Sequence, residues 1–245
     1  MKKSIFYFIL CTFFLQTYGQ VETFSNYPFN GNTYNAIVIK IDVNSIKNFD
    51  ILENTSKQTH EDFIKSLLSG PAFFLINASI SDTSCKPVGY FAKNSQEIQP
   101  ANLNDGQGNF YLKPNGALLF ANDDAIVCES SQITSHQNIL LGIQSGPLLL
   151  NNGTVNTQFN PNSINKKVRC GVGTCLNSKN EKFVVFCISN NPVSFYELAM
   201  LFNKKFKCEN ALCLESEGCT MYFPGQSNQV KNFEGLICNY IFYKL

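Results

Sequence analysis

The sequence has no tryptophan, only two histidines among its 245 residues, and few charged side chains. Charged residues make up 15% of the chain and the formal net charge is +1, so no basic surplus favours binding to nucleic acid or to an anionic membrane surface. Outside the N-terminus, no apolar run approaches the roughly 18 residues that a membrane-spanning helix needs. The sequence therefore predicts a protein without a nucleic-acid partner.

The first 19 residues have the pattern of a secretory signal peptide. Lys2 and Lys3 precede an apolar run from Ile5 to Leu15, which is too short to span a bilayer, and polar residues follow it. We predict cleavage after Gly19, export to the periplasm or the extracellular space, and a single mature domain over residues 20–245 without a stable membrane anchor. The alternative for this segment is an uncleaved anchor.

Ten cysteines are the outstanding feature of the composition. Cys11 lies in the predicted signal peptide, and export would place the others in a compartment where disulfides form. Because an odd number of cysteines then remains, at least one thiol is free or pairs with another chain. A structural zinc site is less favoured, since the sequence has no C-x-x-C and only His60 and His136 to assist. Buried thiols that fill the core are the other alternative.

Short apolar runs bounded by Asn, Gly and Pro predict many short strands. The expected strands are Asn35 to Val43, Ala72 to Asn77, Asn109 to Lys113, Ala117 to Phe120, Ile139 to Ile143, Pro147 to Leu150, Lys182 to Ser189, Ala211 to Leu214 and Leu236 to Tyr243. Turn residues at 114–116 join the third and fourth of these runs, and the turn at 177–180 precedes the strand at Lys182. Antiparallel pairing is therefore expected to dominate.

Two helices stand out among the strands. Ser194 and Glu197 have the spacing of a capping box before an apolar helical face, and a second helix is expected to begin near Thr59. The polar segment from Asn156 to Lys167 is expected to be a long loop, and loops of this length are often functional. The predicted fold class is α+β, a single domain with a mostly antiparallel mixed sheet and about two main packed helices.

Several familiar enzyme classes lack their motifs in this chain. The run from Gly142 to Gly146 does not have the spacing of a lipase nucleophile elbow, and neither a dinucleotide fingerprint nor a phosphate-binding P-loop is present. His60 at a helix start and His136 in a polar loop are expected to be solvated. Nucleophilic catalysis by Cys and His remains open only because both residue types are present.

Four segments place polar residues at the ends of predicted strands, where side chains can converge on one site. They are Leu75 to Ser79, Gln144 to Pro147, Val168 to Gly173 and Ala211 to Gly218. In this order they resemble the phosphodiester glycosidase family, the domain that uncovers the mannose 6-phosphate tag in animals, and in particular its bacterial exported branch. The phrases Pro87 to Tyr90, Gly108 to Gly116 and Met221 to Gly225 add to the resemblance, which extends from about Phe73 to Pro224.

The resemblance implies a hydrolase that cleaves the glycosidic bond of a sugar-1-phosphodiester or phosphoglycan, without a required cofactor. A carboxylate beside the anomeric carbon would stabilise the developing positive charge or activate water. Glu215 is expected in this catalytic role, with Glu217 as a second catalytic carboxylate and Arg169 as the clamp for the phosphate. The expected substrate-binding residues are Asn77, Gln144, Ser145, Gly146 and Ser216.

The chain departs from the family pattern at the key carboxylate. Where the family usually has Leu-Asp-Gly, this sequence has Leu214, Glu215 and Ser216, which lengthens the side chain by one methylene. A displacement of about 1 Å can cost about a hundredfold in rate. The alternative function is therefore a catalytically impaired envelope protein of the same fold that binds a glycan or phosphoglycan.

Two further expectations concern this loop. A weaker alternative is metal-assisted cleavage, in which Asp82, Glu215 and Glu217 bind a divalent cation such as calcium, because such hard cations prefer oxygen ligands. A disulfide from Cys213 or Cys219 to Cys208 or Cys170 would hold the Glu215 loop rigid and compensate for its missing glycine.

Overall fold

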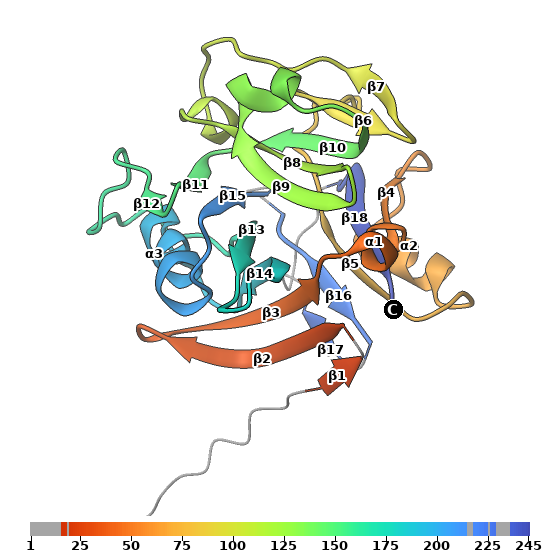
Figure 1. Ribbon diagram of the computed structural model, residues 1–245, viewed down its shortest axis with the longest axis horizontal. Coiled ribbons are helices and arrows are strands. Elements are labelled where there is room, and N and C mark those ends of the chain that lie inside the picture. The colour runs from red at the N-terminus through yellow and green to blue at the C-terminus, as the bar shows by residue number, and fades with distance from the viewer. Residues whose placement is uncertain (1–15, 19, 215–217, 225, 229–235) are drawn as a thin grey trace, which may run out of the picture.

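The computed structural model describes residues 16–18, 20–214, 218–224, 226–228 and 236–245, arranged as three sheets with few helices (Figure 1). Every pairing between the described strands is antiparallel. The expectation of antiparallel pairing is thus confirmed, whereas the expectation of one mixed sheet is wrong. The predicted α+β class with about two main packed helices is confirmed only in part, because the fold is mostly β.

The largest sheet has eight strands and contains the segments that surround Arg169. In spatial order they are β1 (Gln16–Tyr18), β2 (Val21–Phe29), β3 (Asn32–Lys40), β14 (Lys182–Ser189), β13 (Cys170–Leu176), β15 (Asn210–Cys213), β11 (Leu148–Asn151) and β12 (Thr154–Val155). The predicted turn at residues 177–180 joins β13 to β14. Since β1 pairs with β2, cleavage after Gly19, which stays a prediction, would remove an edge strand.

The two smaller sheets have five strands each. One consists of β7 (Gln96–Gln99), β6 (Phe91–Lys93), β10 (Ile139–Ser145), β8 (Gly116–Ala121) and β9 (Asp124–Glu129). The other consists of β17 (Gln226–Asn228), β16 (Met221–Phe223), β5 (Phe73–Asn77), β18 (Asn239–Lys244) and β4 (Phe49–Glu53). β18 lies between β4 and β5, although more than 150 residues separate it from β5 along the chain.

Aromatic side chains from all three sheets meet in the centre of the molecule. Phe49 of β4 stacks on Phe120 of β8 with 4.3 Å between the ring centroids, and Phe186 of β14 lies 5.2 Å from Phe74 of β5. All four rings are at most 5% exposed. Burial of such rings is worth about 1.5–3 kcal/mol each, so this contact fixes how the sheets sit against one another.

The helices cover the outer faces of two sheets. They are α1 (Val43–Ile46), α2 (His60–Leu67), α3 (Phe195–Met200) with the π-helical turn η3 (Leu201–Lys205), and the 3₁₀ turns η1 (Asn109–Tyr111) and η2 (Ser130–Ser135). The capping box of Ser194 and Glu197 and the cap by Thr59 are both present, which confirms the two predicted helix starts. No helix in the described part of the chain is long and apolar enough to cross a bilayer.

Eight of the nine predicted strands are present, seven of them with shifted ends, and one is wrong. Residues 109–111 form the turn η1, in which the amides of Tyr111 and Leu112 donate to the carbonyls of Gly108 and Asn109. The residue that precedes the turn, Gly108, has a φ of +92°. This backbone conformation is unfavourable for residues with a side chain, which explains the glycine at this position. The predicted hairpin cannot form, because β8 is already paired on both edges by β9 and β10.

Candidate functional site

A pocket of about 670 Å³ lies beside the third sheet, where β5 ends and β18 begins. Its lining comes from four stretches that are far apart in sequence: Asn77 with residues 79–83 and Val88, then residues 107–111, Gly218, and residues 236–238. The volume is within the usual range for small-molecule sites, about 300–1,000 Å³. Two of the predicted site segments, those of Asn77 and Gly218, therefore meet at one cavity.

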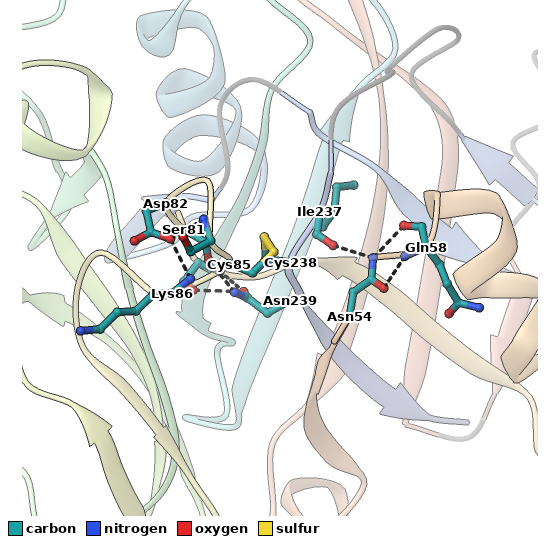
Figure 2. Close-up of a disulfide and its surroundings, with 11 residues drawn as sticks. Asn54, Gln58, Ser81, Asp82, Cys85, Lys86, Ile237, Cys238 and Asn239 are labelled. Atoms are coloured by element: carbon teal, nitrogen blue, oxygen red, sulfur yellow. Dashed lines mark hydrogen bonds between the residues drawn. A yellow bond between two sulfur atoms is a disulfide. The ribbon is translucent and has the colours of Figure 1, made fainter. Parts of the chain in front are cut away.

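The pocket wall at residues 79–85 is fastened to β18 (Figure 2). Cys85 and Cys238 form a disulfide, and Asn239 donates from Nδ2 to Ser81 Oγ at 2.9 Å. Asn239 Oδ1 also accepts from the amide and the hydroxyl of Ser79, at 2.7 and 3.0 Å. The wall is thus held by one covalent bond and several hydrogen bonds.

Asn54 forms hydrogen bonds with the residues that precede β18, Ile237 and Cys238 (Figure 2). Its Nδ2 donates to the carbonyls of Gln58 and Ile237, at 2.8 and 3.0 Å, and its own amide donates to the carbonyl of Cys238 at 2.8 Å. Asn54 is 1% exposed. The backbone around the disulfide therefore has partners on both sides and offers a rigid pocket wall.

Asn77, the last residue of β5, joins the pocket to the chain that follows residue 217. Its Nδ2 donates to the carbonyl of Gly218 at 2.8 Å, and its Oδ1 accepts from the amide of Thr220 at 2.6 Å. The residue is 1% exposed. The structure places Asn77 at the pocket and in contact with Gly218, whereas its substrate-binding role stays a prediction.

A series of buried, hydrogen-bonded polar side chains connects Asn77 to His60. Thr220 Oγ1 donates to Asn77 Oδ1 at 3.2 Å and lies 3.3 Å from His60 Nδ1, which is 3.1 Å from the hydroxyl of Tyr240. Burial lowers the pKa of His60 to about 4, so the ring is neutral at pH 7. The prediction that His60 is solvated is therefore wrong, because Thr220 and Tyr240 enclose the start of α2.

The depressed pKa of His60 makes stability depend on pH. Since the unfolded state binds the proton with a pKa near 6.5, stability is complete above pH 6.5 and is lost as pH falls toward 4. We expect His60 to account for a loss of about 3 kcal/mol across this window. Urea unfolding at pH 7, 5.5 and 4 measures it.

The matched control for this prediction is the other histidine. His60→Gln is expected to flatten the pH dependence between 6.5 and 4. His136→Gln, which replaces the partly buried histidine after η2, controls for the loss of a histidine elsewhere in the chain. Equal slopes in the two variants would contradict the role of His60.

Arg169 is buried immediately before β13, with 1% of its surface exposed. Its Nε donates to the carbonyl of Val193 at 2.9 Å, its Nη2 donates to that of Asn165 at 3.3 Å, and its Cζ lies 3.7 Å from the centroid of the Phe195 ring. Burial lowers the pKa of the guanidinium, and the thiols of the nearby cysteines oppose this shift. Nη1 has no hydrogen-bond partner among the residues that the structure describes.

An unpartnered buried donor on a charged group is costly, about 1–3 kcal/mol or more. Arg169 therefore needs an acceptor at Nη1. It is not one of the residues that line the pocket, so the structure does not itself bring Arg169 into the cavity with Asn77. The predicted phosphate-clamp role stays a prediction.

Gln144, Ser145 and Gly146 lie at the end of β10 rather than in the pocket lining. The Oε1 of Gln144 accepts from the amides of Tyr90 and Asn102, at 2.8 and 2.9 Å, and its Nε2 donates to the carbonyl of Asn102 at 2.7 Å. A Cβ on Gly89 would lie 2.7 Å from Cδ of Gln144, which explains the glycine there. Gln144 thus braces two loops.

Ser145 and Gly146 are close-packed against the neighbouring segments. Ser145 is fully buried, and its Oγ lacks a partner within the described ranges. A Cβ on Gly146 would lie 3.0 Å from both the carbonyl oxygen of Phe110 and Cβ of Asn115. Since Phe110 lines the pocket, a larger residue at 146 would displace the pocket wall at η1.

Glu215, Ser216 and Glu217, the predicted catalytic and substrate-binding loop, lie outside the described residues. Both flanks of the loop are described. The amide of Leu214 donates to the carbonyl of Cys170, next to Arg169, at 3.1 Å, and the carbonyl of Gly218 accepts from Asn77. The loop therefore departs from the Arg169 side and returns on the Asn77 side.

The disulfide differs from the predicted ones. Cys170, Cys208, Cys213 and Cys219 are all unbridged, so the expected link from Cys213 or Cys219 is wrong. The sequence offered only the parity of the cysteines, and the partners Cys85 and Cys238 are separated by 153 positions. The observed bond nevertheless fastens the pocket, because Cys238 is one of its lining residues.

The described part of the chain holds no group of three or more His, Cys, Asp or Glu side chains that could bind a metal ion. It therefore supplies no complete ligand set for the metal-assisted alternative. Asp82 lines the pocket, but its Oδ1 accepts from the amides of Ser84 and Lys86, at 2.8 and 2.9 Å. The other two expected ligands, Glu215 and Glu217, are not described. The expectation of no required cofactor stays a prediction.

Sequence reasoning missed two parts of the site. Apart from Ser79 and Asp82, the residues 79–83 that form the pocket wall entered no prediction of the site. The hydrogen-bonded side chains that lead from Asn77 to Tyr240 join positions 163 residues apart. An available signal was the phrase from Gly108 to Gly116, since Gly108, Phe110 and Tyr111 line the pocket.

The chain is similar to two known proteins, one in sequence and one in fold. Over 156 residues the chain is 31% identical to the uncharacterized protein YigE of Escherichia coli strain K12, which covers 64% of this chain and 60% of YigE. The crystal structure of a hypothetical protein from Synechocystis shares the fold with a TM-score of 0.52 and 11% identity, over 91% of this chain and 62% of that chain. The chain thus matches about three fifths of the length of each. Residues 72–232, more than half of the chain, match the phosphodiester glycosidase family, and the protein therefore belongs to this family.

Proposed function

We propose that the protein hydrolyses the glycosidic bond of a sugar-1-phosphodiester at this pocket, releasing a sugar and a phosphomonoester. The observation that carries the proposal is the position of the pocket. Asn77 and Gly218 line it, and Gly218 is the first described residue after the loop that bears Glu215 and Glu217. A carboxylate on this loop would enter the site next to Gly218, beside a sugar held against Asn77.

The residues around the pocket suggest how the substrate is held. The lining combines the aromatic side chains of Phe110 and Tyr111 with polar groups of Asn77, Asn109 and Asp82. Sugars are bound by this combination, because ring faces cover their C–H groups while amides and carboxylates take their hydroxyls. The pocket therefore suits the sugar part of the substrate.

Arg169 is proposed to neutralise negative charge near Leu214, the described residue that precedes the loop. Its unpartnered Nη1 would donate either to the substrate phosphate or to a loop carboxylate, and its planar guanidinium is held by Phe195 and by two carbonyls. Because the group cannot lose its proton at physiological pH, this positive charge is permanent.

Gln144, Ser145 and Gly146 are proposed to act by position rather than by contact with substrate. The carboxamide of Gln144 is occupied by backbone groups of Tyr90 and Asn102, and Gly146 packs directly against the carbonyl of Phe110. Ser216, on the loop itself, is proposed to contact the substrate.

The test is hydrolysis of an aryl or nucleotide sugar-1-phosphodiester by the mature protein, followed as release of the free sugar and of the phosphomonoester. Substrate panels that vary the sugar and the leaving group are compared, with Glu215→Ala as the blank. Formation of the sugar-1-phosphate and the free alcohol or nucleoside, in place of free sugar and the phosphomonoester, would show that a different bond is cleaved and would overturn the proposal.

The second candidate is a non-catalytic envelope protein that binds a glycan or phosphoglycan. It is favoured by one observation, the replacement of Leu-Asp-Gly by Leu214, Glu215 and Ser216. Saturable binding of a sugar phosphate by calorimetry, with no turnover across the panel and equal binding by Glu215→Ala, would favour this candidate over hydrolysis.

A further inference from the structure

A second pair of thiols meets on the outer face of the eight-stranded sheet, away from the pocket. Cys208 follows η3 and Cys175 lies near the end of β13, and the two side chains are hydrogen-bonded to each other. Both belong to the apolar cluster under α3. They are separated by 33 positions in sequence, so the fold rather than the local sequence brings them together.

The backbone around the pair is fixed by the sheet. Thr174 pairs with Asn210 in the β13–β15 ladder, and the amide of Glu209 donates to the carbonyl of Thr174 at 3.1 Å. A Cβ on Gly173 would lie only 2.8 Å from Sγ of Cys208, so this thiol rests directly on β13. Cys208, in the segment just before β15, therefore lies against the end of β13 that carries Cys175, and Gly173 has no side chain to separate them.

The two thiols differ in access and in acidity. Cys175 is partly exposed, whereas Cys208 is 3% exposed. The hydrogen bond from Cys208 lowers the pKa of Cys175, and burial raises the pKa of Cys208 well above its usual value. A reagent in solution thus meets the more acidic sulfur first, which is the arrangement that favours attack by Cys175.

We propose that Cys175 and Cys208 are a disulfide-forming pair that closes a second covalent bond in this protein, between the end of β13 and the segment before β15. The oxidant is a disulfide, such as oxidised glutathione or the disulfide of an oxidoreductase. The Cys175 thiolate attacks one sulfur of the oxidant and releases the other as a thiol. Cys208 then loses its proton to solvent and attacks the Cys175 sulfur, releasing the second thiol, so two protein thiols are oxidised and one disulfide is reduced.

The bond would cross-link the paired strands β13 and β15 at one of their two ends. Arg169 and Leu214 lie at the other end of this strand pair. β13 begins directly after Arg169, and β15 ends one residue before Leu214, after which the Glu215 loop follows. The two cross-links would then hold two different segments: Cys85–Cys238 holds the pocket wall, and Cys175–Cys208 holds the far end of the strands that lead to Arg169 and to Leu214. This inference does not depend on the proposed hydrolase activity.

Peptide mapping and thiol counting test the proposal. The purified mature protein is incubated with oxidised and reduced glutathione, denatured in acid, and digested without reduction. We expect a linked peptide that contains Cys175 and Cys208, and a fall from seven titratable thiols to five. The oxidised form is expected to melt about 5–10 °C higher than a form in which this bond alone is absent, such as Cys175→Ser.

Control variants keep the test decisive. Cys175→Ser, at a partly exposed position, is expected to abolish the linked peptide and to keep its thiol count unchanged under oxidation. Cys128→Ser removes a buried thiol of β9 and is expected to leave the linkage intact. Seven thiols persisting in the oxidised wild-type protein, or a linkage of Cys208 to Cys187 or Cys213, would overturn the proposal.

Discussion

The Glu215→Ala variant is expected to hydrolyse a sugar-1-phosphodiester on the order of 10³ times more slowly than the wild-type protein, measured as kcat/KM. The expectation follows from the chemistry, because cleavage of the glycosidic bond generates positive charge at the anomeric carbon and requires a carboxylate beside it. Steady-state release of the free sugar at several substrate concentrations gives the ratio.

Two further variants distinguish the specific role of the Glu215 carboxylate from a general effect of negative charge in this region. Glu209→Ala removes an exposed carboxylate just before β15 and is expected to change kcat/KM by less than about threefold. Glu215→Asp/Ser216→Gly restores the Leu-Asp-Gly run that is usual in the family and is expected to match or exceed the wild-type rate. A wild-type rate in Glu215→Ala would assign the catalytic role elsewhere, with Glu217 as the next residue to replace.

The Cys85→Ala/Cys238→Ala variant is expected to lose about 2–5 kcal/mol of unfolding free energy. The bond joins positions 153 apart, so its removal frees a long loop in the unfolded chain. It also releases the pocket wall, which then depends on the hydrogen bonds of Asn239 with Ser79 and Ser81. Urea unfolding at pH 7 measures the loss, and binding of a sugar phosphate measures the effect on the pocket.

The control for this variant is Cys128→Ala, which removes one buried sulfur without opening a cross-link and is expected to cost about 1 kcal/mol. If the two variants were equally stable, the Cys85–Cys238 bond would contribute nothing beyond local packing. Weaker ligand binding in the double variant alone would show that the bond shapes the pocket.

Local features of the fold were predictable because local chemistry decides them. The strand Lys182–Ser189 has the predicted bounds, and the helix starts at Thr59 and Ser194 follow from side chains that cap the first free amides. The prediction at Asn109–Lys113 failed for a non-local reason. An apolar, aromatic run favours a strand by composition, but both edges of its expected partner β8 are taken by β9 and β10.

The difference between local and long-range contacts also explains which parts of the site were predictable. Asn77 and the Gly218 flank were found because the family resemblance identifies whole segments, and the structure brings them to one pocket. His60 was misjudged because its neighbours Thr220 and Tyr240 come from positions 160 and 180 residues further along the chain. The partners of Cys85 and Cys175 are likewise chosen by the packing of sheets, which the spacing of cysteines does not encode.

The position of β18 has a consequence for how the protein is made. β4 and β5 both take their shared neighbour from residues 239–244, so the third sheet stays incomplete until those residues have left the ribosome. Until then β5, all five of whose residues are buried in the folded protein, has no partner on one edge, and the pocket lacks Cys238 and Asn239. Such long-range pairing is slow. We therefore expect the third sheet and the pocket that it carries to form late in folding.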